Sequence, residues 1–269
     1  MRLSSRHTFF KSLLPLLLML LGSSIFGRRK FVQVASAAMS TTSSSSSQYK
    51  GALIFLHGLG DSPAGWSHLE QMLPAIKPSL KDVKYVFPPA PTIPLTINGG
   101  MIMPGWFDLY DWPIGVGSKD DRAGKLKGVE QIQECVKQLT EQDGIPKDKI
   151  VVGGFSQGGA IALLAAYYDS NKNGPYAGCA GLSAWLTLTD DLKVSDNSKK
   201  IPLFWGHGIY DDKVLFEQQA HGIEILDKQG VESIMPSQYP MGHQSDPEEI
   251  KAFAEFVETS IFGGDDKEL

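Results

Sequence analysis

The sequence predicts an α/β fold in which a mostly parallel central sheet carries helices on both faces. Two observations lead to this prediction. Short apolar runs that suit buried strands alternate along the chain with longer segments of helical periodicity. One of these runs passes through a glycine-rich turn directly into an apolar helix, as the connections of a parallel sheet require. With 269 residues, 42% of them hydrophobic, the chain can bury the core of a single domain over residues 50–269.

Five apolar runs are predicted to be strands. Uninterrupted hydrophobic runs of this length are typical of strands that are buried on both faces, as in a parallel sheet. The runs cover residues 53–56, 84–87, 150–153, 178–182 and 202–205. A shorter strand-like run precedes the loop at residues 240–244.

The clearest helix is predicted over residues 120–142, and Gly144 and Pro146 end it. Its apolar residues recur at three- and four-residue spacing, namely Leu126, Val129, Ile132, Val136 and Leu139. This stripe indicates packing against the core. The sequence Ser245-Asp246-Pro247-Glu248 predicts a capping box at the start of the last helix.

The glycine-rich turn carries the most informative motif of the chain. Gly154, Ser156 and Gly158 form G-x-S-x-G between an apolar strand and an apolar helix. Such a turn, the nucleophile elbow, is too tight for side chains on its flanks and exposes the serine hydroxyl at a helix N-terminus. A glycine-rich turn can also contain a serine by chance, so the motif requires support from other residues.

A serine nucleophile needs a histidine base, and three histidines follow Ser156 in the chain. His221 lies in a helical stretch, where a surface position is expected. His207 comes before the best acidic candidate, whereas the base comes last in enzymes that use this turn. His243 lies in the loop at residues 240–244, from which an imidazole could reach the turn. We therefore expect His243 to be the base.

The acid that orients the base is expected just after the preceding strand. Asp211 and Asp212 lie there, and we favour Asp211 over its neighbour. Asp190 and Asp191 form a weaker pair, which we interpret as the solvated end of a helix or loop.

An oxyanion hole requires two backbone N–H groups that point at the developing negative charge. The residue after the nucleophile, Gln157, supplies one of them. The loop after the first strand is glycine-rich and supplies the other, which we assign to the N–H of Leu59. We interpret His57, at the end of that strand, as a structural hydrogen-bonding residue.

Several motifs occur in a fixed order and carry a resemblance to a known family. They are H-G-L-G-D from His57, P-G-W-F-D from Pro104, G-I-P from Gly144, G-G-F-S-Q-G-G from Gly153, L-S-A-W-L from Leu182, H-G-x-x-D from His207, and G-H at Gly242. Over residues 51–262 the chain resembles the acyl-protein thioesterases of the phospholipase/carboxylesterase family. All the catalytic landmarks of that family are present.

The resemblance implies an α/β-hydrolase fold and the hydrolysis of esters or thioesters, typically the removal of palmitoyl groups from protein cysteines. Lysophospholipids and small esters are the expected side substrates. The resemblance assigns the nucleophile to Ser156, the acid to Asp211 and the base to His243. It assigns the oxyanion donors to Leu59 and Gln157.

The candidate substrate-binding residues are Trp106, Trp185 and Lys213. Trp106 belongs to an aromatic-rich stretch that suits either an acyl site or the core. Animal members of the family follow the acid with Pro-Leu-Val, whereas this chain has Asp212-Lys213-Val214. Either Lys213 keeps one wall of the acyl site wet and limits the chain length, or it points into solvent.

Residues 1–49 contain no acidic residue and six basic ones, so the remaining 19 basic and all 30 acidic residues give residues 50–269 a net charge of −11. The apolar run at 13–21 and the small residues at 35–38 predict a signal or transit segment, followed by a serine-rich linker. Two alternatives to such a segment are a signal anchor and an upstream extension that is skipped when translation starts at Met39. We expect the protein to be located in the secretory pathway, the endoplasmic reticulum or another organelle. If translation starts at Met39, we expect it in the cytoplasm. The last four residues only partly match K-D-E-L.

The acidic charge of residues 50–269 argues against nucleic acid as a partner. No metal-ligand or phosphate-cradling motif occurs, so neither a metal nor a cofactor is expected. Cys135 and Cys179 are expected to be buried packing residues, and two cysteines form no disulfide framework. The apolar N-terminal run is short for a membrane span, and we expect the mature protein to have no stable membrane span. We expect a monomer or a weak dimer.

Three functions are compatible with the sequence. The first is a serine acyl-protein thioesterase with broad carboxylesterase activity, which acts on acylated proteins or on small acyl esters and thioesters. The second is a lysophospholipase. The third is a non-catalytic ligand-binding protein on a hydrolase scaffold, which would normally have lost a triad residue, whereas this chain retains all three.

Overall fold

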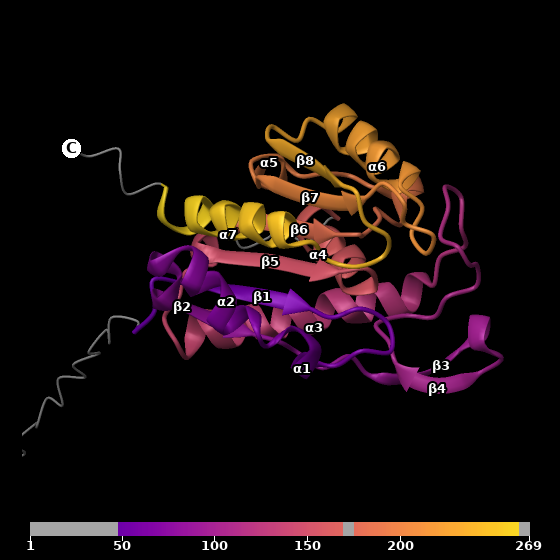
Figure 1. Ribbon diagram of the computed structural model, residues 1–269, viewed down its shortest axis with the longest axis horizontal. Helices are drawn as coiled ribbons and strands as arrows, with labels where there is room; N and C mark the ends of the chain where they lie inside the picture. The colour runs from indigo at the N-terminus through magenta and orange to yellow at the C-terminus, as the bar shows by residue number, and fades with distance from the viewer. Residues whose placement is uncertain (1–47, 169–174, 264–269) are drawn as a thin grey trace, which may run out of the picture. The chain divides into compact units, whose positions relative to one another are not determined.

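The computed structural model describes residues 48–168 and 175–263 (Figure 1). The predicted signal or transit segment, its serine-rich linker and the C-terminal tetrapeptide lie outside these residues. Within the described ranges, no helix combines the length and the apolar composition that a membrane span needs.

A six-stranded sheet with the order β2-β1-β5-β6-β7-β8 forms the centre of the fold, and all its strands pair in parallel. The strands are β1 (Gly51–Leu56), β2 (Val83–Val86), β5 (Ile150–Phe155), β6 (Gly178–Leu182), β7 (Leu203–Gly208) and β8 (Ile234–Tyr239). The five predicted strands are all present, and the weaker strand-like run is the edge strand β8. The prediction of a mostly parallel sheet is therefore confirmed.

An antiparallel hairpin of β3 (Thr92–Leu95) and β4 (Met101–Pro104) lies outside this sheet, and the sequence analysis did not predict it. Pro94 interrupts the apolar pattern of the first strand, and proline disfavours a strand assignment. Near the end of the hairpin, Met101 and Ile102 are exposed. Figure 1 shows the hairpin apart from the main sheet.

Helices cover both faces of the sheet, as predicted. The α-helices are α1 (Pro63–Trp66), α2 (Leu69–Ile76), α3 (Arg122–Glu141), α4 (Gln157–Tyr167), α5 (Asp196–Lys199), α6 (Glu217–Lys228) and α7 (Pro247–Phe262). Short 3₁₀ helices occupy Pro78–Asp82, Thr96–Asn98, Lys147–Lys149 and Thr189–Asp191. Residues of α2 and α7 pack together in one hydrophobic cluster, and residues of α3, α4 and α6 belong to the other.

The first turn of α7 differs from the predicted capping box. The N-cap is Asp246 rather than Ser245, and its side chain accepts a hydrogen bond from the backbone N–H of Glu248. Pro247 explains the difference, because proline favours the first helical position and so makes the residue before it the cap. The loop that carries His243 therefore ends one residue later than expected.

Glu249, also in the first turn of α7, is fully buried, and neither of its carboxyl oxygens has a hydrogen-bond partner among the described residues. The carboxyl group packs against the backbone of Gly206 in β7, where a Cβ atom would collide with it. Burial raises the pKa of Glu249 from its ordinary value of 4.5 to about 8.

This pKa predicts a pH-dependent stability. Because the folded protein holds a proton that the unfolded chain has released above pH 4.5, the stabilisation present at low pH is lost as the pH rises towards 8. We expect the stability of the wild type relative to Glu249→Gln to fall by about 3 to 4 kcal/mol between about pH 5 and 8 and to level off above. Urea unfolding of both proteins across this range measures the difference. An equal pH dependence in the two proteins would contradict the prediction.

Candidate active site

Ser156 lies at the turn between β5 and α4, where it is the N-cap of α4. Its φ of 53° and ψ of −122° place a non-glycine residue in a conformation that side chains rarely adopt. The flanking glycines allow this turn. A Cβ atom on Gly154 would come within 2.5 Å of the Gly158 carbonyl carbon, and one on Gly158 would collide with the carbonyl oxygen of Leu56. The local sequence therefore builds a tight elbow with the serine at its apex.

The three predicted triad residues meet at this elbow, although they come from distant parts of the chain. His243 Nε2 lies 2.9 Å from Ser156 Oγ, and His243 Nδ1 lies 2.8 Å from Asp211 Oδ2. An ionised carboxylate can only accept hydrogen bonds, so Nδ1 donates its proton to Asp211. The lone pair of Nε2 then faces the serine hydroxyl. The arrangement can accept the serine proton when the oxygen attacks an electrophile.

The Asp211 side chain is fully buried and accepts three hydrogen bonds. The backbone N–H groups of Lys213 and Val214 both donate to Oδ1, at 2.9 Å. Burial disfavours the charge, but the hydrogen bond from His243 and those from the backbone outweigh it, so the pKa of Asp211 lies below its ordinary value. Asp212 instead is 73% exposed and pairs with the ammonium of Lys213 at 3.0 Å.

The loop after β1 lies against the elbow, as an oxyanion hole requires. A Cβ atom on Gly58 would lie 3.2 Å from the ring of Phe155, which is a tight contact, and 3.5 Å from Ser156 Cβ, so the absence of a side chain eases this close approach. The backbone N–H groups of Leu59 and Gln157 donate no hydrogen bond within the described residues. Both are therefore free to bind a negatively charged oxygen.

Trp106 lies beneath this loop rather than at its surface. It is 2% exposed, and its indole N–H donates to the carbonyl oxygen of His57 at 2.8 Å. The side chain of Gln157 accepts from the N–H of Trp106 and donates to the carbonyl oxygen of Phe107. His57 donates from Nδ1 to the carbonyl of Gly58, as a structural residue should. Trp106 thus supports the oxyanion loop and is too buried to line an open acyl site.

The other two candidate substrate residues differ in their surroundings. Trp185 is 5% exposed, contacts Phe107 edge to face and lines a pocket. The ammonium of Lys213 pairs with the exposed Asp212, and the Lys213 side chain is 42% exposed. This geometry favours the alternative in which Lys213 points into solvent.

Two further residues support the triad, and the sequence analysis assigned them no such role. The ring of Phe155 packs against the ring of His243 with 4.8 Å between centroids. His207 is fully buried, and its Nε2 lies 2.9 Å from the carbonyl oxygen of Val214, in the loop that holds Asp211. Burial lowers the pKa of His207, which keeps this imidazole neutral beside the acid. Phe155 is the variable residue of the elbow motif, and this position is its only signal in the sequence.

Comparison with known proteins agrees with this geometry. Residues 37–261 match the profile of a family described as phospholipase/carboxylesterase. The chain belongs to this family. Acyl-protein thioesterase 1 of Mycosarcoma maydis is 41% identical over 224 residues, which cover 78% of this chain and 90% of the relative.

Solved structures of similar proteins share the fold of this family member. SOBER1 of Arabidopsis thaliana superposes with a TM-score of 0.71 at 28% identity, covering 78% of this chain and 99% of that one. Acyl-protein thioesterase 2 of Zea mays superposes with a TM-score of 0.68 at 29% identity, covering 80% and 95%. The chain therefore has the α/β-hydrolase fold.

Proposed function

We propose that this chain is a serine hydrolase that cleaves acyl thioesters and esters, with Ser156 as nucleophile, His243 as general base and Asp211 as the acid that orients it. The observation that carries the proposal is the unbroken hydrogen-bonded connection from Ser156 Oγ through His243 to a buried carboxylate. A protein that only binds ligands has no need to keep this connection intact.

The chemistry follows from the positions of these atoms. Ser156 Oγ attacks the acyl carbon as His243 Nε2 takes its proton, and the negative carbonyl oxygen is held by the N–H groups of Leu59 and Gln157. The bond to the leaving sulfur or oxygen breaks, and Nε2 returns the proton to the leaving group. Water then attacks the acyl-enzyme with the same proton transfers, which releases a carboxylic acid and restores Ser156.

The relatives support a protein thioester as the physiological substrate. The relative from Mycosarcoma maydis and the solved protein from Zea mays are both named acyl-protein thioesterases. We propose the same reaction here, the removal of acyl groups such as palmitoyl from protein cysteines. Small carboxylic esters react through the same steps and are expected as additional substrates, with lysophospholipids among them.

A direct assay tests the proposed function. We expect the purified chain to release free thiol from a peptide that carries an S-palmitoyl cysteine, and to hydrolyse the oxyester in which serine replaces that cysteine. Pretreatment with a fluorophosphonate should abolish both activities, because it blocks an activated serine. Folded protein that turns over neither substrate, nor any shorter acyl thioester, would refute the proposal.

A further inference from the structure

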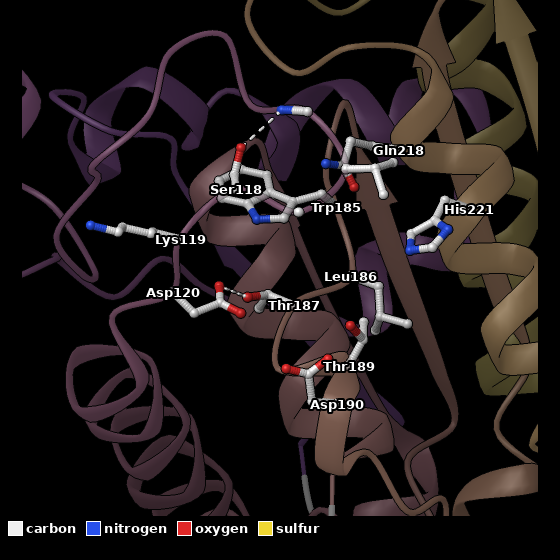
Figure 2. Close-up of a pocket in the computed structure, with 13 residues that line it drawn as sticks. Ser118, Lys119, Asp120, Trp185, Leu186, Thr187, Thr189, Asp190, Gln218 and His221 are labelled. Atoms are coloured by element: carbon white, nitrogen blue, oxygen red, sulfur yellow. Dashed lines mark hydrogen bonds between the residues drawn. The ribbon is translucent and has the colours of Figure 1, made fainter.

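A pocket of about 300 Å³ lies between α6 and two loops. Residues 115–120 form one wall, residues 185–187, 189 and 190 another, and Gln218 and His221 of α6 a third. Figure 2 shows Gln218 and His221 on one side of this space and Lys119 and Asp120 on the other. No step of the proposed reaction uses these residues.

The pocket is built on the segments that carry the triad. The N–H of Ser156 donates to the carbonyl oxygen of Leu182 at 2.8 Å, and the pocket wall begins three residues later at Trp185. On the other side, the backbone of Ile114 bonds to that of Lys213 and Leu215, directly after the catalytic acid. The walls of the pocket are therefore continuous in the chain with segments that are hydrogen-bonded to Ser156 and to the loop after Asp211.

The carboxylate of Asp120, which lines one wall, is hydrogen-bonded and paired with a cation. Asp120 accepts from the hydroxyl of Thr187 and from the N–H of Leu188, and it pairs with the ammonium of Lys125. The Lys125 side chain is only 2% exposed. Because this carboxylate already has its partners, it attracts no cation into the pocket.

Gln218 is the exception among the buried polar residues of the pocket. It is 4% exposed, yet its side-chain amide makes no hydrogen bond with the part of the chain that is described. The adjacent Gln219, by contrast, donates to the carbonyl oxygens of Trp205 and Ser237. The amide atoms of Gln218 are not among the fully buried polar atoms that lack a partner, so water in the pocket can reach them. An apolar ligand that displaces this water leaves the amide without a partner, whereas a ligand that bonds to the amide avoids that loss.

We propose that this pocket receives the acyl group of the substrate and that Gln218 selects acyl groups that carry a hydroxyl over plain hydrocarbon chains. The inference rests on the proposed function and specifies its substrate class. A volume of about 300 Å³ holds roughly ten water-sized groups, because water occupies about 30 Å³. That space admits a medium acyl chain but not the protein part of a thioester.

The hydroxyl is the substituent that matches Gln218. An amide offers both donors and an acceptor, and a hydroxyl can pair with either. A plain chain would displace water from the amide and leave it without a partner, and a longer chain would have to extend beyond the pocket. Sites that hydrogen-bond a substrate hydroxyl discriminate strongly against the analogue that lacks it.

The test uses the full chain and small-molecule thioesters of N-acetylcysteamine with acetyl, octanoyl, and 3-, 5- and 8-hydroxyoctanoyl groups. For the wild type we expect kcat/KM to be about tenfold higher for at least one hydroxyoctanoyl thioester than for the octanoyl thioester. Gln218→Met has a similar shape without the amide and should lose this preference, with faster octanoyl turnover. Gln218→Leu should behave in the same way. Circular dichroism checks that both variants are folded.

The acetyl thioester and a surface variant are the controls. The acetyl group has no chain to place in the pocket, so all the proteins should hydrolyse it equally. Gln138→Met, at an exposed position of α3, should keep the wild-type preference. A wild type that shows no preference, or a preference that survives in both Gln218 variants, overturns the inference while acetyl turnover still supports the proposed function. Loss of acetyl turnover in the wild type would instead overturn the proposed function itself.

Discussion

Replacement of Ser156 by alanine is expected to lower kcat about 10⁶-fold, the loss found when a triad nucleophile is removed. The hydroxyl is the atom that His243 Nε2 contacts at 2.9 Å, and no other group at the apex of the elbow can form the acyl-enzyme. The fold should be unaffected, because alanine removes one oxygen. The rate on an acyl thioester, measured with active-site titration of the wild type, gives the ratio.

A fluorophosphonate probe provides an independent readout of the same change. The wild type should be labelled at one serine, and Ser156→Ala should not be labelled. Ser67→Ala is the matched control, since Ser67 is exposed at the end of α1 and its hydroxyl contacts only a neighbouring backbone carbonyl. Equal labelling of Ser156→Ala and the wild type would show that another serine is the nucleophile.

Replacement of Asp211 by asparagine is expected to lower kcat about 10⁴-fold. The backbone N–H groups of Lys213 and Val214 occupy Oδ1, so the asparagine oxygen should take that position. Its NH₂ group would then face His243 Nδ1 and force that nitrogen to accept. The proton moves to Nε2, which can no longer take one from Ser156.

Asp212→Asn is the matched control for this effect. The two aspartates are adjacent, but Asp212 is 73% exposed and forms its ion pair with Lys213 at the surface. Its replacement should leave kcat within about twofold of the wild type, because exposed ion pairs contribute little. A large loss of kcat in Asp212→Asn together with a small loss in Asp211→Asn would show that Asp212, and not Asp211, is the acid.

The elbow could be predicted from the sequence because it depends on neighbouring residues. Gly154 and Gly158 flank Ser156 by two residues on either side. The close contacts at Gly154 are within the turn itself, whereas those at Gly158 are with the backbone of β1 and its end. The five buried strands were predictable for a similar reason, since burial on both faces leaves a continuous apolar run. The hairpin of β3 and β4 has no such run, and Pro94 obscures it.

The sequence also ordered the candidate acid and base, but it did not show how they would meet. Asp211 and His243 reach Ser156 because β7, β8 and β5 end at the same edge of one parallel sheet. The choice between two adjacent aspartates depends on a backbone turn, in which Lys213 and Val214 donate to one carboxylate and leave the other in solvent.

The sequence by itself therefore determined the family and the fold class and predicted the nucleophile, because each follows from short-range pattern. Only the tertiary structure decided the surroundings of the side chains. It placed Trp106 under the oxyanion loop, Lys213 in solvent and Gln218 unpartnered in a pocket. Burial and hydrogen bonding of a side chain depend on residues that are distant in the chain and adjacent in space, and neither hydrophobic periodicity nor motif spacing records those contacts.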